Sequence, residues 1–313
     1  MLPYADDFDA NSIHVQSGTA VIFLCGGPTS NISEGIPRSL RDAFLKIVDY
    51  GPLKGRDVIQ AEDVTAEFRF FDYYDNILDF EAHLAQIVEL IILFCESEGS
   101  LAELGAFALI DDIAERLFVV VRRKHWNKDS FVRLGPLRRL ERKFDRSLIY
   151  VLSDQEVGMK GDDASAVDKN ALGLVLRDPL IKRLAIKKEP TTYNRARPGH
   201  VIKLIVRLIQ EYGALVEGEI MGLLQIFNTE LDQKEMNGYL LCAEAVGWLE
   251  KVSRGPNDYF IAKKKIDTAV IRVKETAEHK NKDRRRVYIR EYWKNNDRER
   301  YNGIIEVFGS GAR

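Results

Sequence analysis

The chain has 313 residues, of which 45% are hydrophobic and 30% charged, so it can build two packed domains and is not a wholly disordered protein. No apolar run reaches the ~18–20 residues of a membrane helix, and the N-terminus lacks the pattern of a secretory signal. The three cysteines are scattered along the chain, which argues against a disulfide framework. The five histidines do not occur in pairs with acids or thiols, which argues against a zinc site. We therefore expect a cytoplasmic protein without membrane association or bound metal.

The net charge of −2 conceals an asymmetry along the chain. Residues 191–313 hold 22 basic and 17 acidic residues, whereas residues 1–190 hold 24 basic and 31 acidic ones. An acidic first half and a basic second half predict two modules, the second of which could face a polyanion.

The first half alternates short apolar runs with helical patterns. We predict strands at 19–25, 56–60, 89–94, 117–121 and 148–152, and helices at 37–50, 74–87 and 101–115. This alternation predicts an open, parallel α/β sheet with helices on both faces. Ligands of such sheets lie beyond the carboxyl ends of the strands, so the loops after Cys25 and Phe94 are expected to hold a site.

The loop after the strand at 89–94 carries the residues best suited to chemistry. Ser97, Gly99 and Ser100 lead into a helical pattern, and we predict Glu103 in its first turn. A helix N-terminus would stabilise that carboxylate as an anion, which suits a nucleophile or an electrostatic stabiliser. The structural alternative is a capping box, because Ser100 and Glu103 fit the Ser-x-x-Glu pattern.

Two further segments offer candidate residues. Gly26 and Gly27 follow the first strand and could let a phosphate or sugar approach backbone amides, or could form only a tight turn. Glu62 and Asp63 lie past the second strand, and Glu81 lies on the helix before the third. Each of these acids is either a site residue or a solvated surface group.

Three blocks of the first half occur in an informative order. Ile22–Gly27 comes first, then Ile91–Phe94 with Glu96, Ser97, Gly99 and Ser100 behind it, and then Glu103–Phe107. In this order they resemble the nucleoside 2-deoxyribosyltransferase-like enzymes, most closely the branch that serves as effector toxins of bacterial retrons. The segment 135–144 also resembles those effectors, and the resemblance covers residues 20–153.

The resemblance implies roles for single residues. Glu103 matches the catalytic glutamate that attacks the anomeric carbon and displaces the base, and Glu81 falls where the transferases have an aspartate that contacts the nucleoside. Phe23 stands where those enzymes often have a tyrosine. These departures imply hydrolysis, or a larger nucleotide substrate, in place of salvage transfer. The substrate-binding residues expected from the loops after the strands and from this resemblance are Phe23, Gly26, Gly27, Glu62, Asp63, Ser97, Gly99 and Ser100.

The same resemblance implies substrates and partners. The expected target is NAD or another cellular nucleotide, as a substrate and not as a cofactor. The expected partners are a retron reverse transcriptase and its branched RNA–DNA product (msDNA with its non-coding RNA), which would restrain the toxin. The transferases complete their active sites across subunits, so a homo-oligomer or higher assembly is also expected.

The second half predicts a winged-helix-like domain. Helices at 200–212, 216–227 and 231–246 precede two strands, 248–252 and 259–262, whose turn carries Arg254. In a winged helix the third helix enters a major groove and the wing approaches the backbone. Residues 191–262 sum to a charge of −2, however, which suits protein docking better than duplex binding.

The positive charge lies further on. Residues 263–300 hold 14 basic and 7 acidic residues with tyrosines between them, a pattern of nucleic-acid binding or of a solvated amphipathic helix. The candidate phosphate-binding residues are Arg254, Lys263, Lys264, Lys265, Arg284, Arg285 and Arg286.

We therefore predict a catalytic domain at 1–153, a helical linker at 154–190, a winged-helix-like α+β domain at 191–262 and a basic extension at 263–313. The predicted function is a retron effector toxin that cleaves an N-glycosidic bond. The competing hypothesis is a winged-helix transcription regulator whose first domain senses a nucleotide without turnover.

Overall fold

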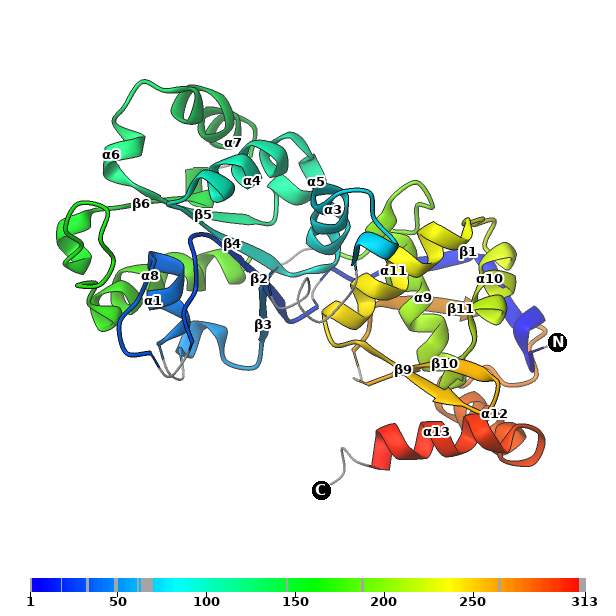
Figure 1. The fold of residues 1–313 in the computed structure, drawn as a ribbon. Coiled ribbons are helices and arrows are strands. Elements are labelled where there is room, and N and C mark those ends of the chain that lie inside the picture. Colours follow the sequence, from blue (N-terminus) through cyan, green and yellow to red (C-terminus); the bar gives the residue numbers. More distant parts are fainter. Residues whose placement is uncertain are drawn as a thin grey trace. The chain divides into compact units, whose positions relative to one another are not determined.

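The computed structural model describes residues 2–17, 19–31, 34–47, 50–60, 62, 70–144, 146–186, 189–263 and 266–309. The chain divides into two compact units. We call residues 20–64 and 88–188 the sheet unit, and residues 1–19, 65–87 and 189–313 the helical unit (Figure 1).

Within the described residues, the sheet unit holds five parallel strands in the order β3-β2-β4-β5-β6. This confirms the predicted α/β class, and each predicted strand is present with small shifts at its ends. The strands are β2 (Val21–Cys25), β3 (Asp57–Gln60), β4 (Leu90–Cys95), β5 (Leu117–Arg122) and β6 (Ile149–Leu152). Every residue of β2, β4 and β5 is buried, as expected for apolar strands covered on both faces.

Helices cover both faces of this sheet, as Figure 1 shows. On one face, α1 (Leu40–Leu45) and α8 (Lys169–Leu184) share a core with Ile22, Leu24 and Ile92 of the strands. The other helices of this unit are α4 (Glu98–Leu109), α5 (Asp111–Ala114), α6 (Arg123–Trp126) and α7 (Arg138–Lys143). The single helix predicted at 101–115 is therefore wrong: the chain is extended at Ile110, which separates α4 from α5.

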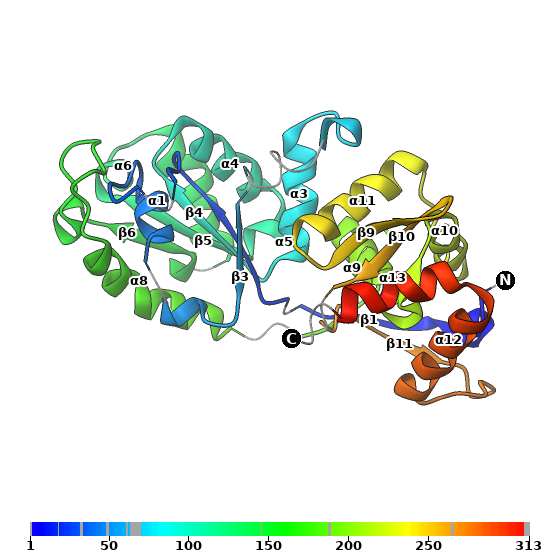
Figure 2. The same cartoon turned by 60° about the horizontal axis from the view of Figure 1, so that its bottom comes forward.

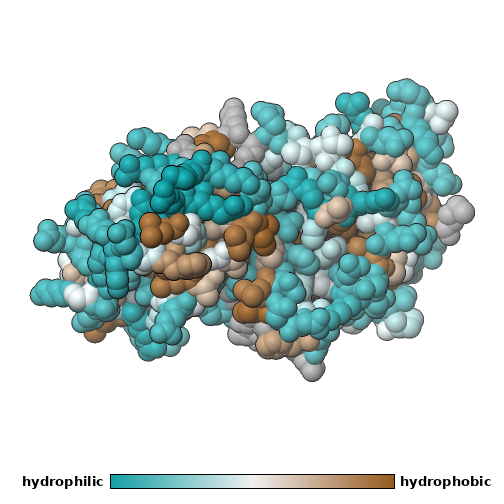
Figure 3. Space-filling view, turned by 90° about the horizontal axis from the view of Figure 1, so that it is seen from above, coloured by the Kyte–Doolittle hydropathy of each residue, from teal (hydrophilic) through white to brown (hydrophobic). Residues whose placement is uncertain are grey.

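The face that carries α4 to α7 leaves several large apolar side chains in solvent. Figure 3 looks onto this side of the molecule and shows brown residues gathered among teal ones. In the sheet unit the exposed fractions reach 69% for Leu109, 85% for Phe131 and 50% for Leu134. Leu109 is the last residue of α4, whereas Phe131 and Leu134 lie in the segment before α7.

The helical unit is built around α9 (Pro198–Tyr212), whose residues are almost all buried. Around it pack α3 (Ile77–Ile87), α10 (Glu217–Ile226), α11 (Gln233–Ala245) and α12 (Lys282–Asn296). The strands β8 (Ala214–Leu215), β9 (Leu249–Arg254) and β10 (Asn257–Ala262) form an antiparallel sheet in the order β8-β10-β9. The three helices and the hairpin predicted for this region are thus present, and α13 (Arg298–Gly309) packs against the hairpin (Figure 2).

The two compact units divide the chain differently from the predicted domains. The N-terminal strand β1 (Phe8–Val15) pairs with β11 (Ala269–Val273) and β7 (Thr191–Thr192), so it belongs to the helical unit. The helix α3 packs on α9 and α11 and belongs there too. The predicted linker at 154–190 instead contributes α8 to the core of the sheet unit, through Leu172, Leu176 and Leu180. Across the described ranges, no helix combines the length and the apolar character needed to cross a bilayer.

Candidate active site

The strand order fixes where a ligand site of the sheet unit should lie. The chain leaves β2 for β3 on one side and passes from β4 to β5 on the other, so the strand order reverses between β2 and β4. Ligands of open α/β sheets bind at such a reversal, beyond the carboxyl ends of the strands. The two loops that begin at Gly26 and Glu96 meet there, as predicted.

Glu96 joins these two loops. Its carboxylate accepts hydrogen bonds from the backbone N–H groups of Gly27 (3.1 Å), Leu40 (2.6 Å) and Arg41 (2.9 Å). Leu40 and Arg41 begin α1, which Ser39 caps through its hydroxyl. Burial raises the pKa of Glu96 above its ordinary value, although the three backbone bonds oppose that shift.

The two glycines are required by the protein's own packing. Gly26 has a φ of +156°, and a Cβ there would lie 2.9 Å from the Cβ of Phe94 and 3.0 Å from that of Arg41. A Cβ on Gly27 would lie 2.7 Å from the Cβ of Ser39 and 3.0 Å from the carboxylate of Glu96. The loop therefore needs glycine even without a ligand.

The N-terminus of α4 differs from the prediction. Ser97 is the N-cap, and it forms the capping box with Ser100 three residues later. Glu103 lies in the second turn, so both the first-turn position and the capping-box alternative are wrong. The predicted stabilisation of its anion is wrong as well: burial raises the pKa of Glu103 to about 7.

Arg41 and Glu62 form an ion pair beside Glu103. Arg41 is 2% exposed, and its guanidinium donates to both carboxylate oxygens of Glu62 at 2.5 and 3.0 Å. Its positive charge lowers the pKa of Glu103, which Glu62 opposes. Within the described part of the chain, two buried atoms here lack a hydrogen-bond partner: Oε2 of Glu103 and Nε of Arg41.

This arrangement offers one unsatisfied carboxylate oxygen and one fixed cation. Buried polar atoms are normally hydrogen-bonded, so an open acceptor and an open donor at the carboxyl edge of the sheet mark a place for a polar ligand. Cys95 is an unsuitable nucleophile, because burial and the neighbouring carboxylates of Glu103 and Glu96 raise the pKa of its thiol. In the residues described, no three His, Cys, Asp or Glu side chains are grouped so as to hold a metal.

The remaining predicted site residues lie in different surroundings. Phe23 is fully buried within β2, Gly99 is exposed, and both hydroxyls of Ser97 and Ser100 are used in the cap. Glu81 lies on α3, in the helical unit, and is 3% exposed. Asp63 falls outside the described residues. The roles assigned to these residues remain predictions.

Sequence reasoning missed Arg41 and Glu96. Neither residue belongs to a hydrophobic pattern, and Arg41 lies on a helix where a charged residue normally faces solvent. Glu96 could have been found, since it follows directly after the most apolar strand, β4.

The candidate phosphate-binding residues are not equally accessible. Arg285 is 2% exposed, and its guanidinium pairs with the buried Glu211, so it is not one of the free surface cations that were predicted. Arg254 pairs with Glu306, and Lys263 with Glu250 at 3.1 Å. Arg284 is exposed, whereas Arg286 is partly buried. Lys264 and Lys265 lie outside the described residues.

A family model described as the STM3845 retron effector protein matches residues 37–251, which is more than half of the chain. The chain belongs to this retron effector family. The matched range begins three residues before α1 and ends within β9, so it includes Arg41, Glu62, Glu96 and Glu103 together with α9 to α11.

Two curated proteins of Escherichia coli resemble this retron effector. One, from retron Ec86, is 33% identical over 136 residues, which span 44% of this chain and 42% of that protein. The other, from retron Ec73, is 27% identical over 228 residues, 68% of this chain and 69% of that protein. Both are provisionally named as ribosyltransferase and DNA-binding proteins.

Proposed function

We propose that this retron effector cleaves the N-glycosidic bond of a nucleotide, with Glu103 as the group that attacks the sugar. The observation that carries the proposal is the buried, unpartnered Oε2 of Glu103 at the reversal point of the sheet. The provisional naming of two relatives as ribosyltransferases agrees with chemistry at an anomeric carbon.

The surroundings of Glu103 suit this chemistry. Cleavage of an N-glycosidic bond places positive charge on the ribose, and a nearby carboxylate stabilises it most strongly where water is excluded. Burial raises the pKa of Glu103 to about 7, so at neutral pH part of the carboxylate is available as a poorly solvated anion. Arg41 keeps this pKa from rising further and holds Glu62 through both carboxylate oxygens.

The proposed reaction has two steps. An oxygen of ionised Glu103 forms a bond to the anomeric carbon while the bond to the base breaks, and the base leaves with the bonding electron pair. Water then attacks the same carbon and releases the sugar, which restores the carboxylate and liberates one proton. Nicotinamide leaves NAD as a neutral molecule, whereas most other bases need a proton as they leave.

We further propose that the helical unit contacts the other retron components. The element order from α9 to β10, with β8 between the first two helices, supports a winged-helix module, which would bind nucleic acid or protein. On this proposal, the reverse transcriptase with its msDNA restrains the effector through that module, and copies of the effector associate with one another.

The experiment is a substrate panel with the purified protein. NAD, ribonucleosides, deoxynucleosides and deoxynucleotides are incubated separately, and free base and sugar product are quantified by mass spectrometry. Release of a base from one class supports the proposal and identifies the substrate. Binding of a nucleotide without release would instead favour the nucleotide sensor, and an absence of both would overturn the assignment of the site.

A further inference from the structure

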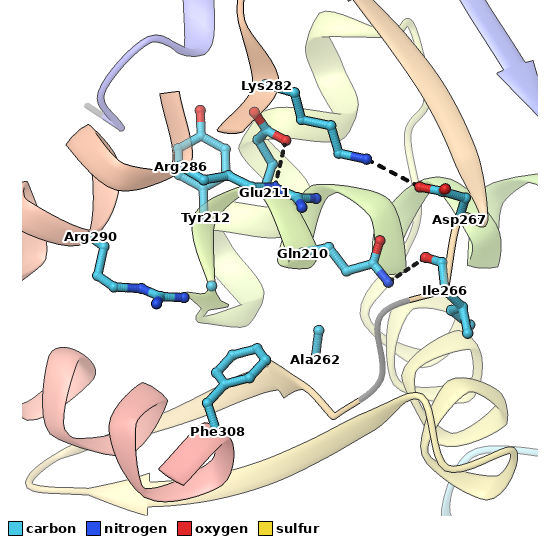
Figure 4. A pocket seen from close by; sticks show the side chains of 11 residues that line it. Gln210, Glu211, Tyr212, Ala262, Ile266, Asp267, Lys282, Arg286, Arg290 and Phe308 are labelled. Atoms are coloured by element: carbon cyan, nitrogen blue, oxygen red, sulfur yellow. Dashed lines mark hydrogen bonds and ion pairs between the residues drawn. The ribbon is translucent and has the colours of Figure 1, made fainter. Parts of the chain in front are cut away.

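A cavity in the helical unit lies at a cluster of buried ion pairs. The cavity measures about 270 Å³, and its walls come from the C-terminal end of α9, from α12 and from Phe308 of α13 (Figure 4). Lys282, Arg286 and Arg290 line it from α12. Their spacing of four residues places these three cations on one face of that helix.

The cluster beneath this cavity carries more positive charge than negative charge. Glu211, whose carboxylate is fully buried, pairs with Arg207 (2.9 Å), Arg285 (2.5 Å) and Arg286 (3.4 Å). One carboxylate thus faces three guanidinium groups. Nε and Nη1 of the buried Arg207 have no partner among the described residues. Arg207 and Arg285 are buried and Arg286 is partly exposed, so this excess of positive charge is costly unless another anion compensates it.

Two further cations line this cavity, and they differ in their partners. Arg290 has neither an ion pair nor a hydrogen bond in the part of the chain that the structure describes, and its guanidinium lies 5.6 Å from the ring of Phe308. Figure 4 shows Arg290 reaching into the space above Phe308. Lys282 is paired with Asp267 at 3.1 Å, the other carboxylate of this wall. An exposed cation beside an aromatic ring suits a ligand that has both a phosphate and a flat ring.

We propose that this cavity binds one nucleotide, with its phosphate held by Arg286 and Arg290 and its base against Phe308. The volume lies just below the roughly 300–1,000 Å³ typical of small-molecule sites, which allows at most one nucleotide and excludes a duplex. A phosphate dianion would offset the excess charge of the arginine cluster. The site is independent of Glu103, and it accepts a free mononucleotide or the phosphorylated terminal nucleotide of a strand.

Photolabelling locates the site directly. The full-length protein is irradiated with 8-azidoadenosine 5′-monophosphate, and labelled peptides are mapped by mass spectrometry. We expect label within residues 198–213 or 282–309, and we expect inorganic phosphate, but not adenosine, to compete with it. Label confined to peptides of the sheet unit, or competition by adenosine equal to that by phosphate, would overturn the proposal.

Two variants and one control separate the parts of the site. Arg290→Ala removes a charge-assisted contact and, within the described residues, breaks no ion pair or hydrogen bond; it loses only the exposed contact with the ring of Phe308. Affinity for the probe should therefore fall at least ~10-fold at a nearly unchanged melting temperature. Phe308→Ala should weaken binding of the probe but leave competition by phosphate nearly intact. Arg298→Ala removes the same charge from an exposed position outside the cavity and should change neither. Equal affinities for Arg290→Ala and Arg298→Ala would refute the proposal.

Short strands distinguish the source of the phosphate. Competition by a 5′-phosphorylated hexadeoxynucleotide, but not by its 5′-hydroxyl form, would identify a strand end as the ligand. Competition by adenosine monophosphate alone would identify a free nucleotide. Base release by Arg290→Ala should equal that of the wild type. Loss of probe binding with normal base release therefore concerns this cavity alone, whereas an absence of base release in the wild type concerns only the proposed glycosidase.

Discussion

Arg41 holds both carboxylate oxygens of Glu62, at 2.5 and 3.0 Å, and leaves Glu103 without that bidentate contact. The two carboxylates near one arginine are therefore in unlike states. Glu62 has its pKa lowered by the pair with Arg41, whereas burial raises that of Glu103 to about 7. Neighbouring acids whose environments move their pKa values apart are typical of sites that handle protons or developing charge.

Removal of the arginine should alter the pH dependence of the proposed reaction. Because the charge of Arg41 lowers the pKa of Glu103, Arg41→Met should raise it above 7 and leave less ionised carboxylate at neutral pH. We expect kcat/KM for base release to fall about 10-fold at pH 7 and to recover partly at pH 9. Arg38→Met, an exposed neighbour, is the control, and Arg41→Lys keeps the charge if the Met variant does not fold. An unshifted pH profile would contradict this role of Arg41.

Ionisation of the buried Glu103 should lower the free energy of unfolding at high pH. Its pKa is raised in the folded state, so between pH 4.5 and 7 the folded protein binds more protons at this group than the unfolded chain does. Stability from this group therefore decreases as pH rises through that window. Glu103→Gln removes the penalty and should raise the melting temperature at pH 8 by roughly 2–4 °C, with little change at pH 4.5. A variant that melts below the wild type at pH 8 would show that the carboxylate is stabilising.

Two glycines provide a matched pair of substitutions. Gly27→Ala would place a Cβ 2.7 Å from Ser39 and should cost roughly 1–3 kcal/mol in the free energy of unfolding. Gly105→Ala meets nothing within 4 Å inside α4 and should instead stabilise by about 0.5–1 kcal/mol. Urea denaturation of both variants measures the difference. Similar urea midpoints for Gly27→Ala and Gly105→Ala would mean that the loop at Gly27 shifts enough to accommodate a Cβ.

The buried ion cluster makes a graded prediction. Glu211→Gln leaves three arginines without their shared carboxylate and should cost about 3–5 kcal/mol of unfolding free energy. Arg285→Ala leaves Glu211 with two partners and should cost less, while the exposed Arg284→Ala should stay within about 0.5 kcal/mol. Chemical denaturation of the three variants establishes the order. Equal destabilisation by Arg284→Ala and Arg285→Ala would mean that Arg285 is not a buried partner of Glu211 in the protein.

The sequence predicted the sheet well because its strands are buried on both faces. Runs such as Leu90–Cys95 have no polar alternation, and local composition alone distinguishes them. The predicted domains differ from the two compact units for the opposite reason. The strand at Phe8–Val15 is stabilised by pairing with Ala269–Val273, more than 250 positions away in the chain, which no local pattern reveals.

The candidate site was predicted in part. The loops and Glu103 followed from the rule that ligands lie at the carboxyl ends of parallel strands. The position of Glu103 in the helix was missed because Ser97 and Ser100 both suit a cap, and only the structure shows that Ser97 begins α4. Arg41 was missed because burial of a charged helical residue depends on its partners, here Glu62, which the sequence does not pair with it.

The most direct test of the account compares base release by two glutamine variants of the same helix. Glu103→Gln keeps the shape of the side chain but cannot attack the sugar, whereas Glu98→Gln changes an exposed residue in the first turn of α4. On the substrate identified by the panel, we predict that Glu103→Gln loses at least ~10²-fold in kcat while remaining folded, and that Glu98→Gln matches the wild type. Equal rates for all three folded proteins would contradict the assignment of Glu103 as the attacking group.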